Sequence, residues 1–113
     1  MLKVLVVGTT EETAETLRVI LRVRWHDLTL LRVPDCRHAL TSVRREETEL
    51  LLVGCDCGMA PTCDLISQVR AFSDAPLVVV GQGEDVTAKV RALEAGADDW
   101  IPASSISMEF IAR

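Results

Sequence analysis

No run of apolar residues in this 113-residue sequence approaches the roughly 20 that a membrane-spanning helix needs. Met1, Leu2 and Lys3 lead directly into a predicted strand rather than into a signal peptide. We therefore expect a cytoplasmic location and no association with a membrane.

Positive charge is also scarce, because 12 Lys and Arg residues face 17 Asp and Glu residues, which gives a net charge of −5. An acidic domain repels a phosphate backbone, so we expect no direct binding of nucleic acid by this domain. Arginines do gather at Arg18, Arg22 and Arg24, but at helical spacing beside acids they are typical of a solvated helix face.

Common catalytic patterns are missing from the sequence as well. It contains no Ser/His/Asp arrangement, no Walker-type phosphate loop and no glycine fingerprint for a dinucleotide. We expect neither enzymatic activity nor a cofactor.

The composition is that of one well-packed domain, with 49% hydrophobic and 26% charged residues. A chain of this length buries about two thirds of its unfolded surface and needs no disulfide to fold. In a reducing compartment the four cysteines are therefore predicted to be free thiols.

Three apolar runs of similar length each stop at a glycine, and this pattern organises the sequence. The runs are residues 4–7, 50–53 and 77–80, and they end at Gly8, Gly54 and Gly81. Continuous apolar runs of this kind predict strands of a parallel sheet that are buried on both faces. Since the carboxyl ends of parallel strands meet at one edge, where ligands bind in open α/β folds, we expect any function at these three glycines.

Helical patterns alternate with these runs. We expect a first helix that Thr9 caps in a capping box with Glu12, a second after Asp35, and a third from about Thr62 with Phe72 inward. A fourth carries an apolar stripe of Val86, Val90 and Leu93 and stops at Gly96, and a fifth is predicted over residues 104–111. Two further strands are predicted over residues 28–33 and 99–101. Five alternations of strand and helix indicate a doubly wound α/β fold with five parallel strands and five helices.

The run from Val90 to Ile101, VRALEAGADDWI, resembles the corresponding stretch of bacterial response-regulator receiver domains, above all those that carry winged-helix DNA-binding outputs. The spacing of the other elements matches over the whole chain. The resemblance implies a flavodoxin-like, CheY-like fold with strand order 2-1-3-4-5. It also implies that residues 1–113 are a receiver-like domain and that the natural protein continues past Arg113 into a C-terminal output domain.

Receiver domains accept a phosphoryl group on an aspartate, and they use further acids for a divalent metal, a hydroxyl as a switch and a lysine. The resemblance places Gly54 at the phosphoacceptor, Gly8 and Thr9 at the acidic pair, Gly81 at the switch hydroxyl and Ala103 at the lysine. Every catalytic part is missing, which indicates a pseudo-receiver that regulates without phosphorylation.

The acids nearest to these positions do not replace them convincingly. Asp56 lies two residues past Gly54, and with Glu11 and Glu12 it could form a weak cluster if the third strand shifted. Such a shift would misplace Arg70 and the apolar face around it, so Asp56 is better interpreted as a loop acid.

The resemblance also implies a symmetric dimer through the fourth helix, fifth strand and fifth helix. The matching positions offer charge pairs of suitable sign between protomers, Lys89 with Glu109 and Asp99 with Arg113. Trp100 stands where the family has an aromatic ring that moves, and with Gly81 opposite we expect its orientation to be fixed by packing.

Cysteines provide the alternative function, a redox or metal sensor. Cys55, Cys57 and Cys63 gather three soft ligands near the vacated site, although the spacing is not that of paired Cys-x-x-Cys units and simple packing of small residues is favoured. A small-molecule effector in the space that the acids vacated is a further partner to consider.

Overall fold

The computed structural model describes residues 2–45, 48–54, 58–81 and 86–102. Five parallel strands form one sheet in the order β2-β1-β3-β4-β5, which confirms the predicted sheet. The strands are β1 (Lys3–Val7), β2 (Thr29–Val33), β3 (Leu50–Gly54), β4 (Leu77–Gly81) and β5 (Asp99–Pro102). The helices are α1 (Glu11–Arg24), α2 (Cys36–Arg45), α3 (Met59–Arg70) and α4 (Val86–Ala95). The predicted fifth helix lies outside the described residues, so four of the five expected helices are found.

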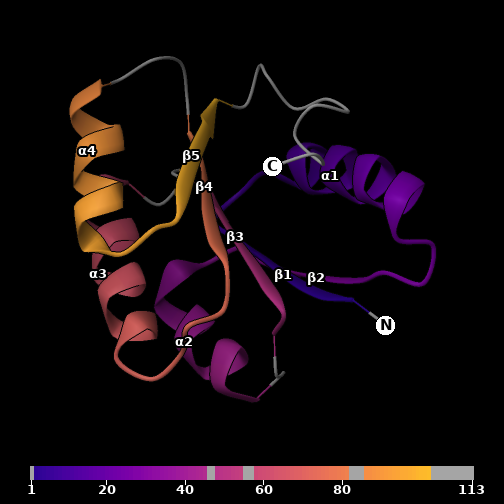
Figure 1. The fold of residues 1–113 in the computed structure, drawn as a ribbon, viewed down its shortest axis with the longest axis horizontal. Coiled ribbons are helices and arrows are strands. Elements are labelled where there is room, and N and C mark those ends of the chain that lie inside the picture. Colours follow the sequence, from indigo (N-terminus) through magenta and orange to yellow (C-terminus); the bar gives the residue numbers. More distant parts are fainter. Residues whose placement is uncertain (1, 46–47, 55–57, 82–85, 103–113) are drawn as a thin grey trace.

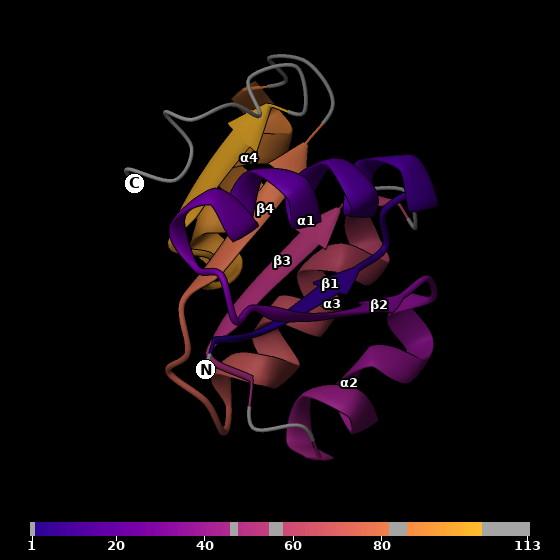
Figure 2. The same cartoon turned by 90° about the vertical axis from the view of Figure 1, so that its right-hand side faces the viewer.

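The helices cover the sheet unevenly. Figure 1 shows α2, α3 and α4 on one face and α1 on the other, and Figure 2 shows α1 crossing in front of the strands. Alternate residues of the strands point to opposite faces of the sheet and pack in two separate hydrophobic cores. On β1, Leu5 and Val7 pack on the side of α2, α3 and α4, whereas Val4 and Val6 pack on the side of α1.

The first helix begins one residue later than predicted, and the capping box with Thr9 is wrong. Thr10 is the N-cap, and its hydroxyl accepts a hydrogen bond of 3.1 Å from the backbone N–H of Thr13. Thr9 does not cap, because its side chain is buried and its methyl group lies beside Gly54 at the end of β3. The shift by one residue turns Thr9 toward the carboxyl edge of the sheet.

The third helix begins at Met59, three residues before the predicted start at Thr62. Pro61 suggested a loop, but the first turn of a helix tolerates proline because the N–H groups there have no partner within the helix. Phe72 was expected to face inward and does not. Phe72 lies beyond the end of α3 and is 42% exposed. The guanidinium of Arg44 lies over its ring, with Cζ 4.8 Å from the ring centre.

The apolar stripe of α4 faces away from the core, which the sequence pattern did not reveal. Val86, Val90 and Leu93 are 70%, 45% and 38% exposed. The inward face of this helix consists of small residues instead, since Ala88 and Ala92 are its buried positions.

An arginine at the amino end of the sheet joins the connections that precede β4 and β5. The guanidinium of Arg70 donates to the Asp98 carboxylate at 2.7 Å, and the same carboxylate accepts the backbone N–H of Leu77 at 2.8 Å. Further hydrogen bonds from Arg70 reach the carbonyl oxygens of Ser73, Ala75 and Gly96, at 3.2, 2.7 and 2.7 Å. These contacts tie the end of α3 to the starts of β4 and β5.

Removing this guanidinium should destabilise the domain. Arg70→Met keeps most of the apolar stem but removes the charged donors, and we expect the free energy of unfolding to fall by about 2 kcal/mol, as for hydrogen bonds to charged groups. Arg91→Met, at an exposed position of α4, is the control and should change it by less than about 0.5 kcal/mol. Urea denaturation of both variants measures the difference, and equal losses would contradict the role assigned to Arg70.

Candidate functional site

The three glycines predicted to mark the site lie at one edge of the sheet, here called the carboxyl edge. In the parallel register Val7 pairs with Val53, and Gly54 pairs with Val80. Gly8, Gly54 and Gly81 therefore end three neighbouring strands, β1, β3 and β4. The expected convergence of these positions is confirmed.

Gly54 is closed in by the loop that follows β1. A β-carbon at this position would lie 2.5 Å from Cγ2 of Thr9 and 2.6 Å from the carbonyl oxygen of Gly8. Both distances are far below van der Waals contact, and one of the two atoms belongs to the backbone. The position that the resemblance assigns to the phosphoacceptor therefore carries no side chain and has no room for one.

The side chain of Thr9 fills the space beside Gly54, and hydrogen bonds to its backbone carbonyl hold the residue in place. The residue is 5% exposed, and its hydroxyl has no hydrogen-bond partner among the described residues. Its carbonyl oxygen accepts hydrogen bonds from Nη2 and Nε of Arg32 on β2, at 2.9 and 3.3 Å. No sequence pattern pointed to Arg32, which brings a positive charge to an edge where a receiver would need acids for a metal.

Gly81 is covered by the ring of Trp100. A side chain at Gly81 would fall inside the indole, whose atoms Cζ2, Cε2 and Cη2 take that space. Trp100 is 5% exposed and belongs to the core on the side of α2, α3 and α4. This packing supports the expected fixed orientation of the ring. It also means that Trp100 offers a predicted dimer interface little surface of its own.

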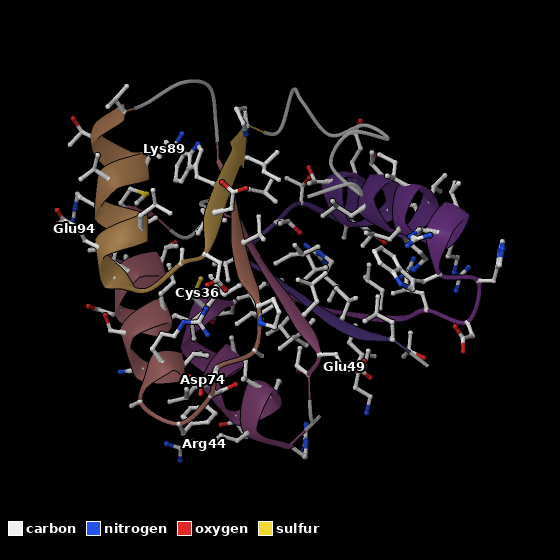
Figure 3. The ribbon with its side chains drawn as sticks, in the orientation of Figure 1. Cys36, Arg44, Glu49, Asp74, Lys89 and Glu94 are labelled. Carbon is white, nitrogen blue, oxygen red and sulfur yellow. The ribbon has the colours of Figure 1, made fainter. Side chains whose placement is uncertain are left out.

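The remaining interface residues are only partly placed. Lys89 is exposed on α4, and its side chain reaches toward the side where β5 lies, whereas Glu94 points away from the sheet (Figure 3). Asp99 is half-buried on β5, and its carboxylate accepts the backbone N–H of Trp100 at 2.8 Å. Ala103, Glu109 and Arg113 lie outside the described residues, so neither charge pair can be traced.

The cysteine site is equally incomplete. Cys63 is half-buried in α3, and Cys36 is buried at the start of α2 (Figure 3). Cys55 and Cys57 lie outside the described residues, as does Asp56. Within the part of the chain that the structure describes, no three His, Cys, Asp or Glu side chains are grouped to hold a metal.

A groove of about 560 Å³ lies away from these glycines, on the α1 side of the sheet. Its floor is apolar and includes Leu50, Leu52 and Val78, with Glu49 and Asp74 among the acids that line it. Of the predicted site residues that are described, Asp99 alone lines this groove.

None of the helices in the described ranges combines the length and apolar character needed to span a membrane.

Curated proteins with similar sequences are response regulators. The chain is 33% identical over 114 residues to the sensory transduction protein RegX3 of Mycolicibacterium smegmatis. The aligned residues make up 100% of this chain and 49% of that protein. It is 32% identical over 111 residues to the DNA-binding response regulator MtrA of Mycobacterium tuberculosis, covering 98% of this chain and 48% of that protein. The chain thus spans about half the length of the curated relatives it matches. No protein-family model matches it.

Solved structures agree on the fold. A two-component response regulator from Clostridium difficile superposes with a TM-score of 0.84 at 15% identity, over 99% of this chain and 90% of that one. The BeF3-activated N-terminal receiver domain of Klebsiella pneumoniae RstA gives 0.77 at 22% identity, over 98% and 93%. The chain has the fold of a response-regulator receiver domain, and its relatives in sequence are response regulators.

Proposed function

We propose that this chain is the receiver-like regulatory domain of a two-component-type response regulator, and that it acts through protein contacts without being phosphorylated. The observation that carries the proposal is the closure of Gly54, which removes both the nucleophile and the space for it. The relatives support an attached output module, and the name of MtrA makes DNA binding the preferred output.

Phosphoryl transfer needs an oxygen that attacks phosphorus and acids that hold a metal to offset the charge. The side chain of Gly54 is a hydrogen atom, so it offers no oxygen to attack phosphorus. Gly8 and Thr9 supply no carboxylate to hold the metal. Glu11 and Glu12 are exposed in the first turn of α1 and join no metal-binding group among the described residues. The chemistry is therefore abolished rather than slowed.

The contact surface that we propose is the face formed by α4, β5 and the predicted fifth helix, in a symmetric homodimer. Its centre is the exposed apolar stripe of Val86, Val90 and Leu93, which no described element covers. The predicted pairs Lys89–Glu109 and Asp99–Arg113 would surround it, each contributing about 0.2–1 kcal/mol as exposed ion pairs.

The other predictions rest on the sequence alone. No described contact favours the redox or metal sensor, and a small-molecule effector finds no room at Gly54 or Gly81 themselves. The cytoplasmic location, the lack of a cofactor and the lack of direct nucleic-acid binding stay predictions.

The first test is chemical. After incubation with phosphoramidate or acetyl phosphate and Mg²⁺, we expect the intact mass of the protein to be unchanged. A receiver domain that keeps its aspartate, treated in parallel, is the positive control and should gain one phosphoryl group. An adduct on this chain would overturn the proposal, and fragmentation would locate the acceptor.

Closure of the site predicts the sign of a stability change. A glycine-to-alanine change in a strand with free space stabilises by about 0.4–1 kcal/mol, because it restricts the unfolded chain. Gly54→Ala should instead destabilise by about 1–3 kcal/mol, the usual cost of overpacking. Adding Thr9→Ser removes Cγ2 but leaves the Gly8 carbonyl, so it should recover only part of the loss. Stabilisation by Gly54→Ala in thermal or urea unfolding would show that the space is open.

The dimer is tested at its apolar centre. Val90→Ser should weaken self-association by about tenfold, since a symmetric interface buries the residue twice. Val23→Ser, which alters a comparably exposed valine on α1, should leave association unchanged. Sedimentation velocity over a range of concentrations measures both variants, and equal behaviour of the two would exclude α4 as the interface.

A further inference from the structure

The loop that closes Gly54 has little to hold it besides packing. Gly8 turns out of β1 with a φ of 67°, a conformation that favours glycine, and its N–H donates to the Val33 carbonyl at 3.0 Å. Thr9, the next residue, is buried, yet its hydroxyl has no hydrogen-bond partner among the described residues. An unpaired hydroxyl opposes burial. The closed position of Thr9 therefore depends on what binds its backbone.

Arg32, on the edge strand β2, binds the backbone of Thr9 from outside the loop. Its Nη2 and Nε donate to the Thr9 carbonyl oxygen at 2.9 and 3.3 Å. Within the described ranges, no other side chain hydrogen-bonds to Gly8 or Thr9. Arg32 pairs with Val6 in the register of β1 and β2, so its side chain leaves the sheet on the side of α1. A single side chain thus connects the edge of the sheet to the loop.

The hold of Arg32 on the loop is open to competition. Arg32 is exposed, and no described acid forms an ion pair with it. A guanidinium binds a carboxylate more strongly than a neutral carbonyl, because the pair is charged and forms two parallel hydrogen bonds. A carboxylate placed beside Arg32 would therefore take its donors away from Thr9.

We propose that Arg32 is a latch. While its guanidinium holds the Thr9 carbonyl, the loop after β1 stays over Gly54, and a carboxylate that draws the guanidinium away at the β2 edge releases the loop without unfolding the domain. The latch rests on the proposed function, because it regulates the same closure of Gly54. It makes β2 a second control point, at the opposite edge of the sheet from β5 in the proposed dimer face.

The complete chain with Thr9→Cys tests the latch, since a thiol at position 9 reacts with iodoacetamide only when the loop opens. Cys36, which is buried in the other core, reports unfolding of the whole domain in the same sample, and peptide mapping separates the two labels. Adding Arg32→Met should label position 9 about tenfold faster and leave the rate at Cys36 unchanged, because hydrogen bonds from a charged donor are lost locally. Arg32→Lys, which keeps the charge but not the paired donors, should give an intermediate rate.

Arg70→Met is the control for this labelling experiment, at the other end of the sheet. It weakens the whole domain, so it should accelerate both labels by the same factor. If Arg32→Met also accelerates position 9 and Cys36 equally, or accelerates neither, the latch is overturned.

Release by a carboxylate is tested within the chain. Pro34 is exposed and stands two positions beyond Arg32, so in an extended chain its side chain leaves on the same side. In the Thr9→Cys background, Pro34→Glu should label position 9 several-fold faster than Pro34→Gln, which has the same shape without the charge. Equal rates in these two variants would overturn release by a carboxylate.

A thermodynamic cycle tests the link to Gly54 itself. The factor by which Gly54→Ala lowers the equilibrium constant for folding should be about threefold smaller in Arg32→Met than in wild type, because the freed loop moves away from the new methyl group. In Arg70→Met the factor should equal that of wild type, since changes at distant sites add. Equal factors in all three backgrounds would overturn the latch. No phosphoryl donor is used, so this failure would leave the proposed function standing, whereas a phosphoryl adduct would overturn that function whatever the labelling rates.

Discussion

The packing of the loop after β1 against Gly54 decides what the carboxyl edge of this sheet can do. Thr9 approaches with its methyl group and Gly8 with its carbonyl oxygen, and only a residue without a side chain allows both. The hydrogen bonds from Arg32 hold the carbonyl of Thr9 and thus keep the loop in place. The buried hydroxyl of Thr9, which finds no described partner, is the cost of this arrangement. The glycine at position 54 is therefore required by the backbone around it as well as by the Thr9 methyl group.

A second glycine, Gly81 at the end of the neighbouring strand β4, is also closed in by another residue. Gly81 has no side chain, and the Trp100 indole occupies the space that one would take. Protein cores tolerate arrangements that conserve total volume in this way. Because the indole is supplied from β5, the helix above needs only alanines on its inner face. The position that the resemblance assigns to the switch hydroxyl thus has no side chain, and a buried aromatic ring covers it.

Sequence reasoning predicted the parts of the fold that depend on repeated patterns. Apolar runs ending in glycine located β1, β3 and β4, and alternation with helices predicted the sheet. It failed where the outcome depends on which of two similar residues is buried. Thr9 and Thr10 are equally able to cap a helix, and only the approach of Thr9 to Gly54 decides between them.

The orientation of α4 could not be predicted for a related reason. The spacing of Val86, Val90 and Leu93 indicates a stripe but does not say on which side it lies, and hydrophobicity favours the wrong side. The buried side consists of Ala88 and Ala92, which share a core cluster with Trp100, a residue on another element. Likewise, the Arg70 contacts with the turns before β4 and β5 carry no periodic signal, because they join residues far apart in the sequence. That network lies at the amino end of the sheet, whereas Gly54 lies at the carboxyl end of β3. The Arg70 contacts that stabilise the domain are therefore separate from the residues at the carboxyl edge, and the backbone superposes on a two-component response regulator from Clostridium difficile with a TM-score of 0.84.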